Sequence, residues 1–186
     1  MNILYNIIEQ NIIKDTPPEA EIIKDAILEH INCDVLAILF YGSCLRTGNF
    51  KDNVADFYVI VSNYGKIPLL EKFIGHLLPP NVYYIEIPIN NQKLRAKYGV
   101  FTLKQFKKMS SINAFQPYLW ARLVQPMQLI YAKDEITKEK IIDCISIASI
   151  TTLFNTLPLI KTTFNLQELW LRSFKFTYKS EVRHNI

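Results

Sequence analysis

The sequence predicts an α/β fold in which a sheet-forming first half is followed by a helical second half. Two continuous apolar runs of strand length support the first part of this prediction, "DVLAILFY" at 34–41 and "ADFYVIV" at 55–61. After residue 101 the apolar residues recur at helical spacing, which supports the second part. We therefore expect an α/β domain over 1–105 and a helical domain over 106–186.

The remaining elements follow from periodicity and from helix-start and turn residues. Residues 2–14 form an amphipathic helical pattern, and Pro17–Pro18 marks the start of a second helix at 18–31. Strand "NVYYIEIPI" ends at two asparagines before the strand "KLRAKYGVF". The later elements expected in order are a helix at 68–78, these strands at 81–89 and 93–101, and helices at 102–110, 113–125, 134–156 and 165–178.

Composition, charge and cysteine spacing favour a folded chain over a disordered one and limit its partners. Of the 186 residues 49% are apolar and 20% charged, which is typical of a folded chain. The net charge of +4 suits phosphate-bearing partners or an anionic membrane surface, and no nucleic-acid-binding signature accompanies it. The three cysteines are widely spaced and indicate reduced thiols in a cytosolic compartment. The apolar stretch "CISIASITTLFNTLPLI" is interrupted by polar residues and Pro, so we expect any membrane contact to be peripheral.

Gly42–Ser43 directly follows the first apolar run. A strand that ends in Gly-Ser allows backbone N–H groups and a hydroxyl to approach a triphosphate, because a Cβ at the glycine would block that approach. The alternative is an ordinary turn glycine.

Asp56 lies inside the second apolar run. An ionised carboxylate among such neighbours costs several kcal/mol, roughly the penalty of a buried charge, unless it is paired. Mg²⁺ would pair it, and Mg²⁺ bridging carboxylate and phosphate oxygens is common in nucleotidyl transfer. The alternative is a salt bridge to Lys97 or Arg46. Many nucleotidyltransferases have Asp-x-Asp at about this distance after Gly-Ser, but here Tyr58 stands at the second acidic position.

Lys93, Arg95 and Lys97 alternate along the strand "KLRAKYGVF", so three cations are expected on one face. Such a row suits a polyphosphate or a phospholipid headgroup, although lysines also protect edge strands against aggregation.

Other polar residues support more than one interpretation. Glu86 would be either a further metal carboxylate or a solvent-facing residue, and Arg122 either pairs with an acid or binds phosphate. His30 and His76 are expected to pack among apolar neighbours.

The chain resembles the mitochondrial-type phosphatidate cytidylyltransferases, also called mitochondrial translocator assembly and maintenance proteins, which have bacterial relatives. The matching segments are "FYGS" at 40–43, "ADFYVIV" at 55–61, "VYY" at 82–84, "KYGV" at 97–100, "YLWARLVQPMQLIY" at 118–131 and "TYKSEVR" at 177–183. They occur in family order from residue 36 onward.

This resemblance implies a polymerase-β-like nucleotidyltransferase domain with a mixed sheet, followed by a helical domain. The implied reaction is Mg²⁺-dependent transfer of CMP from CTP to phosphatidate, which yields CDP-diacylglycerol and pyrophosphate for phospholipid and cardiolipin biosynthesis. The implied location is the bacterial cytoplasm, peripherally on the inner membrane.

The residues themselves and the resemblance together give the expected residue roles. Asp56 and Lys97 are the expected catalytic residues, and the metal ligands are Asp56 with Glu86 or Asp52. The other expected sites are nucleotide binding by Gly42, Ser43, Arg46, Lys97 and Tyr98, and phosphate or lipid-headgroup binding by Lys93, Arg95 and Arg122.

Two departures from the family leave alternatives open. Family members often continue past the Asp strand with two acids and a Trp-His stretch, whereas "VSNYGKIP" follows here. Family members also continue beyond the last match, so we expect a shortened C-terminus. The alternatives are a nucleotidyltransferase with another acceptor and a truncated, non-catalytic relative.

Overall fold

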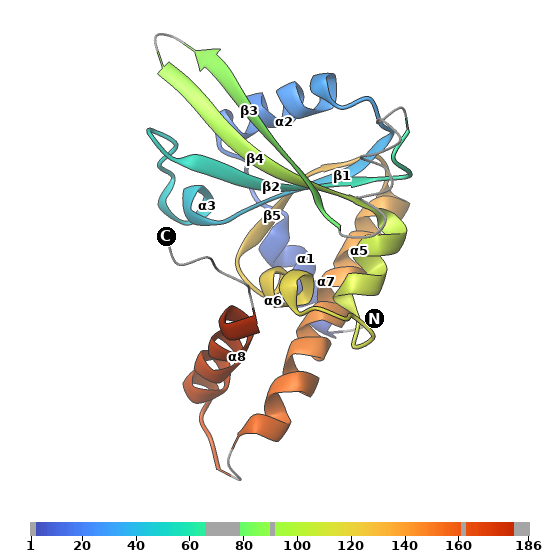
Figure 1. Cartoon of the computed structure of the whole chain (residues 1–186), viewed down its shortest axis with the longest axis vertical. Coiled ribbons are helices and arrows are strands. Elements are labelled where there is room, and N and C mark those ends of the chain that lie inside the picture. The colour runs from blue at the N-terminus through green and yellow to red at the C-terminus, as the bar shows by residue number, and fades with distance from the viewer. Residues whose placement is uncertain (1–2, 66–78, 90–91, 161–162, 181–186) are drawn as a thin grey trace.

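The chain forms a mixed five-stranded sheet with helices on both faces (Figure 1). The computed structural model describes residues 3–65, 79–89, 92–160 and 163–180. The strand order is β3-β4-β2-β1-β5. Strands β2 and β4 are parallel, and the other neighbouring pairs are antiparallel. The bounds of the strands are β1 Val35–Tyr41, β2 Val54–Val61, β3 Asn81–Ile89, β4 Gln92–Thr102 and β5 Met127–Ala132.

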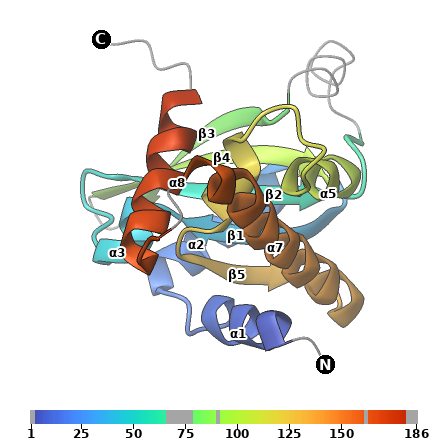
Figure 2. The same ribbon diagram turned by 90° about the horizontal axis from the view of Figure 1, so that it is seen from below.

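Most of the helices cover one face of this sheet. In Figure 2, α7 crosses in front of the sheet, beside α1. Helices α1, α5, α6 and α7 contribute to a core that includes Leu39 and Ile60. Helix α2 covers the opposite face with Ile23 and Ile27. The bounds of the helices are α1 Ile3–Ile12, α2 Pro18–His30, α3 Ser43–Thr47, α5 Leu103–Ser110, α6 Tyr118–Leu123, α7 Glu135–Thr156, the 3-10 turn η1 Leu157–Leu159 and α8 Leu166–Ser180.

The α/β class and most expected elements are confirmed, with ends that differ by one to a few residues. Strand β5 was not expected. It comes from the half predicted to be helical, and it pairs with β1 at the edge of the sheet. The helix expected at 113–125 is shorter, since α6 occupies only Tyr118–Leu123. The helix expected at 68–78, together with His76, lies outside the described residues.

His30 corrects a prediction. It is the last residue of α2 and is exposed rather than packed, because the buried side of that helix is formed by Ala20, Ile23 and Ile27.

The longest helix has a mixed environment. By length and composition alone, the stretch Glu135–Leu159 would be able to cross a membrane, and half of its most apolar window is buried inside the protein. Core helices pass the same test of length and composition. The C-terminal part of α7 and the helix α8 extend away from the sheet side by side (Figure 1).

Candidate functional site

The candidate site is a row of polar residues across the sheet. Asp56 on β2 is paired with Tyr41 on β1 and with Lys97 on β4, and Lys97 is paired with Tyr84 on β3. Residues paired across neighbouring strands direct their side chains to the same face of a sheet. The row therefore lies on the face that carries α6 and α7, at the end of β1 that leads into α3.

Asp56 and Lys97 form an ion pair in this row. Lys97 Nζ lies 3.5 Å from Asp56 Oδ1, and the two side chains are 54% and 24% exposed, respectively. The salt bridge to Lys97 that the sequence left open is thus present. Among the described residues Arg46 forms no ion pair, so the alternative salt bridge between Asp56 and Arg46 is not formed.

Gly42 lies directly against the Asp56 carboxylate. Its backbone has φ +90° and ψ −156°, a conformation that is nearly restricted to glycine. A Cβ added at Gly42 would lie 2.7 Å from Asp56 Oδ2 and 3.3 Å from its Cβ. Glycine is therefore required both for the turn and for the close approach of the turn to the carboxylate.

Helix α3 begins immediately after this glycine. Ser43 is its exposed first residue, and no side chain caps its N-terminus. Because the first N–H groups of a helix lack acceptors within the helix, they can bond to an external acceptor. The first N–H groups of α3 thus follow directly after the glycine that contacts the Asp56 carboxylate.

Tyr58 stands at the position where many nucleotidyltransferases have a second acid. Its side chain is fully buried, and its ring stacks on Tyr41 with centroids 4.3 Å apart. Burial raises the pKa of the Tyr58 hydroxyl well above its usual range, and Tyr41 and Tyr118 add to the effect. A neutral phenol cannot replace a carboxylate as a metal ligand, so Asp56 is the one acid on this segment of β2.

Arg122 approaches the row from α6. Its guanidinium lies over the Tyr118 ring, with Cζ 5.2 Å from the ring centroid. Burial is the main cause that raises the pKa of Tyr41, the Asp56 charge raises it further, and Arg122 lowers it. Tyr41 is therefore within electrostatic reach of both charged residues. Tyr41 has no expected role in the sequence, although it immediately precedes Gly42 in the matching segment "FYGS".

Glu86 is not brought to Asp56. Its Oε2 accepts a hydrogen bond of 2.9 Å from Lys93 Nζ, and its Oε1 lies 3.5 Å from Arg95 Nε and accepts from the Tyr84 hydroxyl at 2.8 Å. Lys93 and Tyr84 lower the pKa of Glu86. Its partner in the register is Arg95, and β3 is two strands away from β2, about 10 Å across the sheet. The two carboxylates proposed as joint metal ligands are thus separated in this structure.

The three cations of β4 share one face as expected, since their partners on β3 are Pro88, Glu86 and Tyr84. Tyr98 is not part of this face. Its ring is buried in the core on the α2 side and stacks on Tyr83, with centroids 5.4 Å apart. The structure therefore does not place Tyr98 beside the nucleotide residues with which it was grouped.

Asp52, the other candidate ligand, is exposed in the turn before β2, where its φ is +57°. Among the described residues, no group of three or more His, Cys, Asp and Glu side chains comes close enough to hold a metal ion. Asp56 remains the carboxylate with the best placement, since Mg²⁺ is commonly bound by one or two carboxylates together with substrate phosphates and water.

Comparison of the chain with models of known protein families and with curated proteins gives no match.

Proposed function

We propose that the chain is a nucleotidyltransferase that transfers CMP from CTP to phosphatidate and releases pyrophosphate. The observation that supports it most strongly is the contact between the Gly42 turn and the Asp56 carboxylate, with Lys97 at 3.5 Å. A polymerase-β-like arrangement is proposed for the β1–α3–β2 unit, where a Gly-Ser turn and a strand carboxylate meet. The resemblance of "FYGS", "KYGV" and "YLWARLVQP" to the cytidylyltransferases supports the choice of substrates.

Each residue of the row has a proposed role. The turn N–H groups and the Ser43 hydroxyl bind the β- and γ-phosphates of CTP. Asp56 holds Mg²⁺, which would neutralise phosphate charge when bound. Lys97 leaves Asp56 and binds a phosphate oxygen once the nucleotide and Mg²⁺ are present. Arg122, held over Tyr118, binds the phosphate of the acceptor.

The reaction needs no strong general base. A phosphate oxygen of phosphatidate, already anionic at neutral pH, forms a bond to the α-phosphorus of CTP. The bond between the α-phosphorus and the bridging oxygen to the β-phosphate breaks, and its electron pair leaves with pyrophosphate. Positioning and charge neutralisation by the fixed side chains supply most of the rate.

The membrane that carries the acceptor is proposed to contact the end of α7 and the helix α8. Large apolar side chains are exposed there, which a lipid surface would cover. They include Phe154, Leu157, Leu166 and Leu171.

The test is a CDP-diacylglycerol assay with CTP, phosphatidate in mixed micelles and Mg²⁺. The intact protein is expected to form product, and Asp56→Asn is expected to form none while it folds normally. Asp143→Asn, which changes an exposed carboxylate on α7, is the matched control and should retain activity. Turnover that survives Asp56→Asn would refute the assignment of the metal to this residue.

A second candidate function is a domain that binds nucleotide without turnover. The Asp56–Lys97 ion pair and the buried Tyr58 favour it, because together they leave one carboxylate that is already neutralised. CTP binding without product at high enzyme concentration would support this second function. Absence of both binding and product would reject both.

A further inference from the structure

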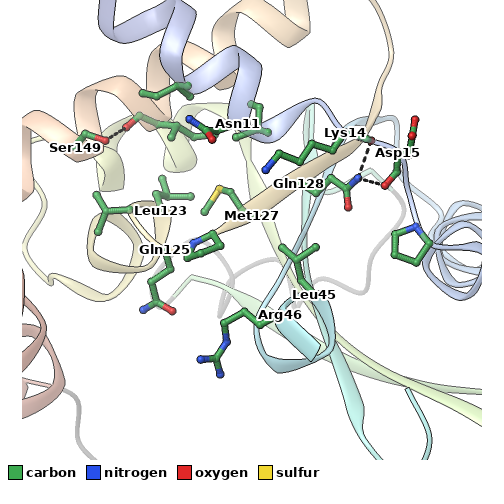
Figure 3. Close-up of a pocket in the computed structure, with 16 residues that line it drawn as sticks. Asn11, Lys14, Asp15, Leu45, Arg46, Leu123, Gln125, Met127, Gln128 and Ser149 are labelled. Atoms are coloured by element: carbon green, nitrogen blue, oxygen red, sulfur yellow. Dashed lines mark hydrogen bonds between the residues drawn. The ribbon is translucent and has the colours of Figure 1, made fainter. Parts of the chain in front are cut away.

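A cavity of about 610 Å³ lies beside the candidate site and has no role in the mechanism above. It lies between α1 with its following loop, α3, the start of β5, and α7 (Figure 3). Its volume is within the range of about 300–1,000 Å³ that is usual for small-molecule sites. Met127 in its wall is paired with Tyr41, which is paired with Asp56. The cavity is thus two strands away from the carboxylate.

The inner wall of the cavity is aliphatic. Ile8, Ile12, Leu123, Met127 and Ile145 line it, and none of the described lining residues is aromatic. Nucleobases are usually held by stacking on aromatic rings or on an arginine. A wall of branched aliphatic side chains favours a flexible hydrocarbon chain instead, because the favourable free energy comes from the apolar area removed from water.

The rim carries an excess of positive charge. Lys14 and Arg46 line the cavity and are exposed, and within the described part of the chain neither forms an ion pair. Figure 3 shows the Lys14 side chain extending across the cavity and Arg46 at the opposite rim. Asp15 is the one acid among the described lining residues. An anionic group at the rim would therefore be attracted.

The loop that carries Lys14 is fixed from inside the protein. Gln128 is 3% exposed, and its Nε2 donates to the carbonyl oxygens of Lys14 and Asp15 at 2.7 and 2.8 Å. These bonds hold the rim in place in the absence of a ligand, which reduces the ordering cost of binding.

We propose that this cavity binds the hydrocarbon chain of an anionic amphiphile, whose head group contacts Arg46 and Lys14. The ligand has two possible sources: phosphatidate held with its phosphate at this rim, outside the reactive position beside Arg122, or a separate fatty acid. The inference does not depend on transferase activity, because binding is measured without CTP.

The experiment is calorimetric titration of the full chain with dodecyl phosphate below its critical micelle concentration. Ser149 lines the cavity from α7, so Ser149→Phe fills the cavity while Ser149→Ala leaves it open. The Ser149 Oγ donates to the carbonyl oxygen of Ile145 within the same helix, and both variants remove this bond equally. We expect Ser149→Phe to weaken binding at least tenfold and Ser149→Ala to leave it unchanged. Glycerol 3-phosphate, which has the head group without the chain, should bind weakly to all three proteins.

The head-group contact is tested by variants on the exposed rim, which are not expected to disturb folding. Arg46→Met and Lys14→Met should each weaken dodecyl phosphate binding several-fold and leave the binding of dodecyl maltoside, an uncharged amphiphile, unchanged. Competition distinguishes the sources: displacement by dioctanoyl phosphatidate but not by dodecanoate identifies phosphatidate, and the reverse identifies a fatty acid.

Three results would overturn the proposal. They are equal binding of dodecyl phosphate by Ser149→Phe and Ser149→Ala, rim variants with unchanged affinity, and a loss of CTP binding in Ser149→Phe with dodecyl phosphate binding intact. The last would assign the cavity to the nucleotide. A protein that forms no CDP-diacylglycerol but binds dodecyl phosphate in this pattern would refute the proposed function alone.

Discussion

Replacing Gly42 by alanine tests the geometry on which the candidate site depends. The φ of +90° with ψ of −156° is a nearly glycine-only conformation, and holding another residue there costs about 1–3 kcal/mol. The new Cβ would also meet Asp56 Oδ2 at 2.7 Å. For a chain of 186 residues, a loss of 1 kcal/mol lowers Tm by about 2–4 °C. We therefore expect a Tm about 2–12 °C lower than that of the intact protein.

The loss of activity should exceed what this destabilisation explains. Asp56 lies on β2 between β1 and β4, so its backbone cannot retreat, and the carboxylate must rotate away from the new methyl group. A misplacement of about 1 Å in a catalytic group can cost about 100-fold in rate. Thermal denaturation measures the first effect, and CDP-diacylglycerol formation at 10 °C or more below the variant's Tm, an interval on the order of the expected shift, measures the second.

Gly48→Ala is the matched control. Gly48 has φ +65°, and a Cβ there would have no atom within 4 Å. It should therefore show only a backbone cost of about 1–2 kcal/mol and no specific loss of activity. A stability cycle of Gly42→Ala with Asp56→Ala isolates the contact, since the double variant removes the oxygen at 2.7 Å. If Gly42→Ala and Gly48→Ala lose equal stability and both keep full turnover, the proposed contact has no functional importance.

Three further predictions concern residues around this row. Lys97→Met should change the free energy of unfolding by less than about 1 kcal/mol, because its ion pair is partly exposed. It should nevertheless clearly weaken CTP binding in calorimetry, and unchanged affinity would argue against a phosphate role. Glu86→Gln should leave the Mg²⁺ dependence of turnover unchanged, since Glu86 pairs with Lys93 and Arg95. A clear rise in the Mg²⁺ concentration needed for turnover would instead identify Glu86 as a metal ligand. Burial raises the pKa of the Cys144 thiol from 9.0 to about 12, so above pH 9 the thiol ionises in the unfolded chain but not in the folded one. The free energy of unfolding should then fall by about 1.4 kcal/mol per pH unit more steeply than in Cys144→Ala, and parallel urea-denaturation curves between pH 9 and 11 would contradict this.

The parts of the site that could be predicted are those set by local pattern. Strand β2 is apolar apart from Asp56, so the sequence alone indicates that this one charged residue needs a partner. The shared face of Lys93, Arg95 and Lys97 follows from the two-residue period of any strand. The sequence predicts the Asp56–Lys97 pair only as an alternative, because the pair depends on β2 and β4 being parallel neighbours.

The parts that could not be predicted depend on contacts far apart in the chain. Strand β5 has six residues, and periodicity over so short a stretch does not separate strand from loop. It is a strand because the edge of β1 is available for pairing. Arg122 reaches Tyr41 only because α6 packs over the end of β1, about 80 residues earlier in the sequence. The separation of Glu86 from Asp56 likewise depends on the strand order, in which β4 lies between β3 and β2.

Because Tyr58 is neutral and buried, β2 offers one carboxylate to a metal ion, and this affects how Mg²⁺ and the nucleotide bind. One carboxylate that is already paired with Lys97 offers Mg²⁺ little free energy. The triphosphate of CTP supplies further oxygen ligands and an alternative partner for Lys97, so nucleotide and Mg²⁺ should each strengthen binding of the other. Titration of the free protein with Mg²⁺ should therefore give weak binding, and the same titration with a non-hydrolysable CTP analogue present should give affinity at least tenfold higher. Equal Mg²⁺ affinity in the two titrations would mean that the protein alone holds the ion. In that case a second ligand would exist that neither Tyr58 nor Glu86 provides in this arrangement of strands.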